Sequence, residues 1–150
     1  MKPPLCSKED VVVLKEALKD GTIDAIVTDH APHDRLEKEC EFDYASFGII
    51  GLETSLSLAV TQLLDEGILD WPGIISKMSC NPCKILKYDR GTLKPGSVAD
   101  VVVIDPDRKW VYTEEQIKSK SKNSPFIGWK MRAKPEYVFI GGKVCKLENE

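Results

Sequence analysis

Residues 24–33 read DAIVTDHAPH, and this stretch decides the fold. Its first half is a short apolar run, which is typical of a strand buried on both faces in a barrel or a doubly wound sheet. Asp29, His30 and His33 follow at once, and these are the only histidines in the chain. In α/β folds the residues that carry out chemistry stand where such strands leave the core. The stretch therefore predicts a functional site directly after a buried strand.

The three polar side chains suit binding and proton transfer. Asp29 can bind a cation through oxygen or accept a proton, and His30 and His33 can ligate a metal or hydrogen-bond an anionic substrate. The alternative is structural: Asp29 and His30 cap a turn before Pro32. The complete string TDHAPH at residues 28–33 favours the functional interpretation.

That string and its surroundings resemble the dihydroorotase branch of the amidohydrolase superfamily. The similar segments follow in the family's order and cover almost the whole chain: KPPL at 2–5, TDHAPH at 28–33, FGIIGLET at 47–54, NPCKIL at 81–86, GTLKPGSVADV at 91–101, SPFIG at 124–128 and a closing strand pair at 138–144. The segment at 91–101 is specific only to the superfamily.

The resemblance implies an α/β fold that is the C-terminal part of a metal-dependent (β/α)8 barrel. The last βα unit and its helices would occupy residues 1–90, and strands of a small β domain residues 91–150. A complete barrel needs about 250 residues, and this chain has 150. We therefore interpret the chain as the C-terminal part of a dihydroorotase.

The family's reaction is the reversible cyclisation of N-carbamoyl-L-aspartate to L-dihydroorotate in pyrimidine biosynthesis. By resemblance, Asp29 is both a metal ligand and the group that shuttles the proton, and His33 binds the substrate carboxylate. The backbone at Phe47 and Gly48 would contact the ring. Lys2 stands where the family has a substrate-binding Asn or Arg, although a lysine is a point charge and not a planar donor pair.

The complete family site holds one or two Zn²⁺ ions. Its ligands come from an early His-x-His, a carboxylated lysine or an aspartate, two later histidines and the aspartate that Asp29 matches. A two-metal site needs several ligands from different strands. We therefore predict that the isolated chain neither holds metal tightly nor hydrolyses substrate. The role of His30 stays open between packing and support of a ligand.

Two other functions stay open. One is a related cyclic amidohydrolase, such as an allantoinase or a dihydropyrimidinase. The residues Ala31, Pro32 and His33, which end the TDHAPH string, fit these enzymes less well. The other is a catalytically dead scaffold for aspartate transcarbamoylase, which the departures at Lys2 and at Cys6, where the family often has Arg, make credible. A parent sequence without the upstream His-x-His would favour the scaffold.

Composition indicates a soluble globular segment, with 42% hydrophobic residues, 30% charged residues and a net charge of −3. A nucleic-acid surface needs clustered positive charge. The lysines at 118, 120 and 122 directly follow Glu114 and Glu115, so we interpret them as a solvated loop. With no apolar run of about 20 residues and no signal-peptide pattern, we expect a cytoplasmic protein without membrane contact.

Five cysteines in a chain without an export signal predict reduced thiols. Cys80 and Cys83 have the spacing of a redox or half-zinc motif, but no second pair completes it. The alternative that we favour is a helix start, with Asn81 as the cap and Pro82 at the first position.

Local signals predict the remaining elements. A helix begins at the capping box of residues 7–10 and ends at Gly21, a strand spans 23–28, and a polar loop spans 34–46. Helices follow at 52–66, after Asp70 and after Asn81. Residues 98–104 predict a strand buried on both faces and stopped by Pro106, and 137–145 a hairpin around two glycines. The sheet edges left uncovered predict self-association.

Overall fold

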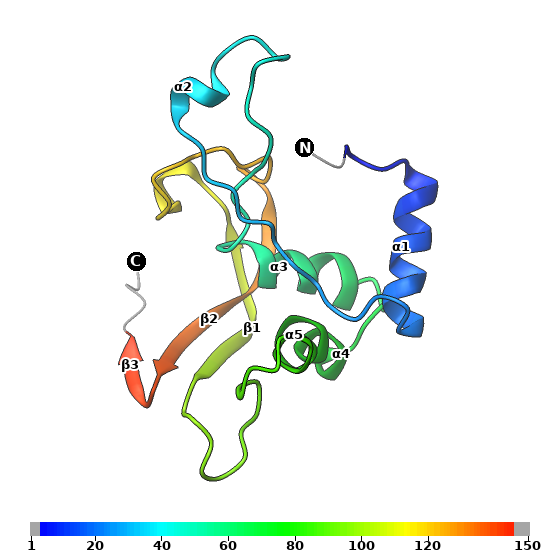
Figure 1. The fold of residues 1–150 in the computed structure, drawn as a ribbon, viewed down its shortest axis with the longest axis vertical. Coiled ribbons are helices and arrows are strands. Elements are labelled where there is room, and N and C mark those ends of the chain that lie inside the picture. The colour runs from blue at the N-terminus through cyan, green and yellow to red at the C-terminus, as the bar shows by residue number, and fades with distance from the viewer. Residues whose placement is uncertain (1–3, 146–150) are drawn as a thin grey trace.

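The computed structural model describes residues 4–145, in which a group of helices packs against a three-stranded antiparallel sheet (Figure 1). The elements, in order, are α1 (Lys8–Asp20), α2 (Arg35–Lys38), α3 (Ser55–Ala59), η1 (Val60–Leu64), α4 (Trp71–Ile75), η2 (Ser76–Cys80), α5 (Asn81–Ile85), β1 (Val101–Val111), η3 (Glu114–Gln116), β2 (Lys130–Ile140) and β3 (Lys143–Cys145). Helix α3 continues directly into the π-helical turn η1, and α4, η2 and α5 form one helical run.

Helix α1 begins and ends as predicted. The Ser7 hydroxyl accepts a hydrogen bond from the Asp10 amide at 3.1 Å, and the Asp10 carboxylate accepts one from the Ser7 amide at 3.0 Å. Gly21 ends the helix with φ 90°. The apolar stripe of α1 is poorly covered, since Val11 is 41% and Leu14 44% exposed. An apolar face of this kind is stable only when something packs on it.

The helix predicted at 52–66 is confirmed over 55–64, and the Asp70 carboxylate caps α4 by accepting from the Gly73 amide at 2.8 Å. The predicted cap at Asn81 is wrong, because Asn81 and Pro82 lie inside the run 71–85. Proline lacks the N–H that would bond back along the helix. The backbone carbonyl of Lys77, five residues earlier, accepts instead from the Ile26 amide at 3.0 Å.

The predicted strand at 23–28 forms no ladder within the described residues, and only the isolated parallel bridge between His30 and Ile49 follows it. A strand needs neighbours, and residues 4–145 provide none beside this segment. The helical run 71–85 holds it instead: the Lys77 ammonium donates to the Ile23 carbonyl at 2.6 Å and the Asn81 amide to the Asp24 carbonyl at 2.9 Å.

The sheet has the order β1-β2-β3. Strand β1 does not stop at Pro106 as predicted, because a register shift between Asp105 and Lys109 lets the strand bulge around the proline. Val102 and Val103 are 51% and 41% exposed, so the expected burial of both faces is wrong for the described chain. The hairpin is confirmed: Gly141 and Gly142, both with positive φ, join β2 to β3.

Two small apolar cores hold these elements together. One is formed by Ala59, Val60, Leu63, Ile74 and Ala133, and the other by Ile50, Tyr112, Ile117 and Met131. The first joins helices to β2. The division at residues 90 and 91 stays a prediction. No helix among residues 4–145 is both long enough and apolar enough to cross a membrane.

Candidate active site

Asp29 follows the extended segment and lies exposed, with the backbone in the left-handed region at φ 42°. Aspartate tolerates this region better than most residues, and such conformations concentrate at functional sites. Within residues 4–145 its carboxylate has no hydrogen-bond or ion-pair partner. Asp29 is therefore available to a ligand from outside the described chain.

His30 has a structural role. Its Nδ1 accepts hydrogen bonds from the amides of Gly51 and Leu52 at 3.1 and 3.3 Å. An accepting Nδ1 places the ring proton of a neutral imidazole on Nε2. The Ala31 amide also donates to the Ile49 carbonyl at 2.9 Å. His30 therefore fastens the end of the 23–31 segment to the chain just before α3.

His33 and Gly48 are brought together. A Cβ atom added to Gly48, whose φ is 116°, would lie 3.4 Å from His33 Nε2 and 2.5 Å from the Ala31 Cβ. On the other side of the ring, His33 Nδ1 lies 3.2 Å from the Glu37 carboxylate. Phe47 is 60% exposed beside Gly48. Lys2 lies outside the described residues.

Two side chains that the sequence did not single out hold the Gly48 backbone. Lys38 Nζ donates to the carbonyls of Ser46 and Gly48 at 2.7 and 3.0 Å. Asn123 Nδ2 donates to the carbonyls of Gly48 and Ala31 at 3.1 and 3.3 Å. The unusual length of the polar loop pointed toward Lys38. Nothing local marks Asn123, which is far away in sequence.

A polar pocket of about 530 Å³ opens beside His33. It is lined by four cationic side chains, Arg35, Lys38, Lys120 and Lys122, and by two carboxylates, Glu39 and Glu114. Arg35 already pairs with Glu39 at 2.7 Å. The remaining charges leave the pocket with an excess of positive charge, which favours anions.

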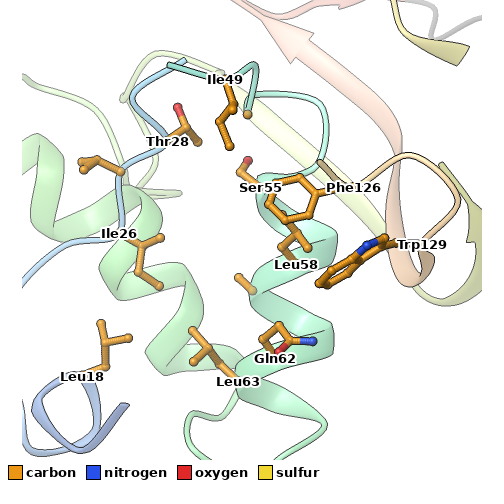
Figure 2. A pocket seen from close by; sticks show the side chains of 13 residues that line it. Leu18, Ile26, Thr28, Ile49, Ser55, Leu58, Gln62, Leu63, Phe126 and Trp129 are labelled. Carbon is orange, nitrogen blue, oxygen red and sulfur yellow. The ribbon is translucent and has the colours of Figure 1, made fainter. Parts of the chain in front are cut away.

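A second, apolar pocket of about 450 Å³ lies between the 26–28 segment and α3 (Figure 2). Figure 2 shows Ile26 and Leu18 on one side and Leu58, Phe126 and Trp129 on the other. Its lining carries no charged side chain. This pocket is therefore a packing surface for apolar groups and not a site for the chemistry of Asp29.

The described residues do not fit a complete zinc site. No group of three or more His, Cys, Asp or Glu side chains in residues 4–145 could hold a metal ion. Asp29 offers one carboxylate, and a zinc site needs at least three protein ligands. Cys80 and Cys83 both lie within the helical run 71–85, and the Cys80 thiol donates to the Gly91 carbonyl at 3.3 Å.

Comparison with known proteins gives consistent matches. The model of the amidohydrolase family matches residues 3–145. Dihydroorotase from Geobacter metallireducens is 57% identical over 96% of this chain, and that from Elusimicrobium minutum 54% over 99%. Each match spans 34% of the relative's own length.

Solved structures of hydantoinases match as well. D-hydantoinase (dihydropyrimidinase) from Thermus sp. superimposes with a TM-score of 0.90 at 30% identity, over 100% of this chain and 34% of that one. L-hydantoinase from Arthrobacter aurescens gives 0.90 at 32% identity, over 99% of this chain and 34% of its own. These matches confirm the expected α/β fold, the C-terminal part of a (β/α)8 barrel with a small antiparallel sheet. The chain belongs to the amidohydrolase family.

Proposed function

We propose that this chain carries part of the active site of a dihydroorotase, which interconverts L-dihydroorotate and N-carbamoyl-L-aspartate. The observation that carries the proposal is the pairing of His33 with Gly48 a few residues beyond the exposed Asp29. Identity of 57% to a dihydroorotase, against 30–32% to the hydantoinases, supports this substrate over a hydantoin.

Asp29 is the proposed proton carrier. An exposed carboxylate without a partner in the described chain can accept a proton from the attacking water and return it to the ring nitrogen that leaves. The same carboxylate can serve as one ligand of Zn²⁺, with the other ligands supplied from outside residues 4–145. Zn²⁺ bound there would supply Lewis-acid polarisation of the carbonyl that is attacked.

His33 is the proposed partner of the substrate carboxylate. An imidazolium that donates to a carboxylate makes a charge-assisted hydrogen bond, which is about twice as strong as a neutral one. The backbone of Phe47 and Gly48 would lie against the ring, where the absence of a side chain on Gly48 allows close approach. By resemblance, Lys2 is also proposed to bind the substrate.

A two-chain assay tests the proposal. We expect neither turnover of dihydroorotate nor tight zinc binding by the chain alone. Mixed with the preceding two thirds of the Geobacter metallireducens dihydroorotase, it should restore turnover that Asp29→Asn abolishes and the control Asp43→Asn, at an exposed loop carboxylate, leaves intact. Turnover by the chain alone, or an assembled but inactive mixture, would contradict the proposal.

A dihydropyrimidinase or hydantoinase is the second candidate, favoured by the TM-scores of 0.90. The same mixture assayed with dihydrouracil and hydantoin separates the two. Turnover of these neutral rings and not of dihydroorotate would favour the second candidate, because they lack the carboxylate that His33 is proposed to bind.

Binding to aspartate transcarbamoylase stays a prediction, which co-sedimentation with that enzyme tests.

Self-association is also proposed for the chain alone. Support comes from the open apolar pocket and from Val12 and Val13 of α1, which are 60% and 66% exposed. Among residues 4–145, β1 is also paired on one edge only. Exposed apolar patches and strand edges promote association. Sedimentation velocity should show a mass that grows with concentration, and a monomer at all concentrations would contradict this.

A further inference from the structure

We infer that α2, a single helical turn, is the positioning element of the substrate site, with Glu37 orienting His33 and Lys38 fixing the backbone of Gly48. The inference rests on the proposed function and extends it to two residues that had no role in it. Glu37 and Lys38 are consecutive, and their side chains reach the two residues that the structure brings together.

Glu37 determines which ring nitrogen of His33 faces the substrate. A carboxylate only accepts hydrogen bonds, so the contact of 3.2 Å requires a proton on His33 Nδ1. The bond holds the ring in place and leaves Nε2 on the side of Gly48. With Nδ1 engaged, Nε2 donates to a substrate carboxylate only when the ring is doubly protonated.

Lys38 fixes the other wall of the site. Its ammonium group bonds the carbonyls of Ser46 and Gly48, and the Ser46 amide donates to the Glu37 carbonyl at 3.0 Å. Three hydrogen bonds therefore join α2 to residues 46–48. The Gly48 carbonyl also accepts from Asn123. With two donors on this oxygen, the peptide plane after Gly48 has one orientation, and the glycine stays against the His33 ring.

Helix α2 lies outside the apolar cores, so a positioning role in the site can be distinguished from a role in stabilising the fold. The helix has four residues and none of them is buried. Leu36, its only apolar residue, is 82% exposed. The two cores are built from other elements. Loss of the Glu37 or Lys38 contacts should therefore change the site while the melting temperature stays the same.

The test uses the 150-residue chain, with N-carbamoyl-L-aspartate as the probe and NMR as the measurement. The variants are Glu37→Gln and Lys38→Met. Each has a matched control: Glu41→Gln removes an exposed loop carboxylate and Lys94→Met removes an exposed ammonium, and neither residue lines the pocket beside His33. The signals are the two ring nitrogens of His33 and the amide of Gly48.

We expect the wild type to bind the probe with the His33 nitrogens moving to imidazolium shifts. Each site variant should bind about tenfold more weakly, the scale of losing a hydrogen bond that involves a charged group. The controls should stay within twofold, and Lys38→Arg should recover part of the loss. Equal affinity in wild type and site variants, or an equal loss in the controls, would overturn the inference.

Two ligand-free signals keep the inference testable if the chain alone holds the probe too weakly. Glu37→Gln should shift His33 Nδ1, and Lys38→Met should speed the exchange of the amides at 48 and 49, with no such change in Glu41→Gln or Lys94→Met. Unchanged spectra in the site variants would overturn the inference. Failure of the proposed function can be distinguished from failure of this inference. In that case the two-chain mixture is inactive, but the His33 and Gly48 signals of the chain still change in the Glu37 and Lys38 variants.

Discussion

The side-chain amide of Asn81 donates to the backbone carbonyl of Asp24 across 2.9 Å and joins α5 to the segment that leads to Asp29. Together with Lys77, it substitutes for the sheet neighbours that this segment lacks among residues 4–145. A side-chain amide inside a helix thus helps to hold the segment that leads to the proposed proton carrier.

Asn81→Ala should release this segment. We expect the free energy of unfolding to fall by about 1–2 kcal/mol, because the side chain loses its hydrogen bonds to the Asp24 carbonyl and the Ser76 hydroxyl. Amide exchange at residues 24–28 should accelerate more than in the core. Lys84→Ala, an exposed change on the same helix, is the control and should leave both measurements unchanged. Equal exchange in the two variants would show that Asn81 does not hold the segment.

Features that are stabilised by contacts between residues close together in the sequence could be predicted from the sequence. The Ser7–Asp10 capping box, the Asp70 cap and the Gly141–Gly142 turn each close a contact over two or three positions, so their sequence signals are sufficient. The amidohydrolase fold was predicted by resemblance and not by such local signals.

Features that depend on distant partners could not be predicted. The 23–28 segment has the composition of a strand, but pairing depends on neighbours. Asn81 and Pro82 have the pattern of a helix start, yet the carbonyl that Pro82 leaves without a donor finds one in Ile26, from another part of the chain. Asn123 reaches Gly48 over 75 positions in sequence. No local pattern encodes such contacts.

Gly48→Ala should displace the segment that lies against His33. The new methyl group would stand 2.5 Å from the Ala31 Cβ, and φ at 116° is unfavourable for alanine. Gly21→Ala is the matched control, because its φ is 90° and nothing lies within 4 Å. Both variants carry backbone strain, on the order of 1–3 kcal/mol. Only Gly48→Ala should also shift the NMR signals of His33 and Ala31. Equal shifts in both variants would argue against the close contact.

Ser57→Ala should destabilise the helix and sheet packing. Ser57 is buried, and its hydroxyl donates to the Ala133 carbonyl at 2.6 Å, where the Trp110 indole also donates at 3.2 Å. Because one donor remains, we expect a loss of about 1 kcal/mol by denaturant unfolding. In a Trp110→Phe background the carbonyl loses both donors, so the double variant should lose more than the sum of the single losses. If the stability losses of the two single variants add up to that of the double variant, the two side chains do not act together on the Ala133 carbonyl.

Tyr112 should make the fold sensitive to alkali. Burial raises its pKa to about 12, the negative charge of Glu53 adds to this effect, and a hydrogen bond with Ser124 opposes it. In the unfolded chain a tyrosine loses its proton near pH 10. Between these two values the unfolded state binds fewer protons than the folded state, so the free energy of unfolding falls as the pH rises.

The Tyr112→Phe variant isolates this contribution, because phenylalanine does not titrate. From about pH 9 to about pH 12 the wild type should lose on the order of 2 kcal/mol more stability than the variant. Glu53→Gln should shrink that difference, since it removes the charge while keeping one of the two oxygens that accept from the Lys118 and Ser119 amides. Parallel stability curves for wild type and Tyr112→Phe would mean that the Tyr112 hydroxyl reaches water in the folded state.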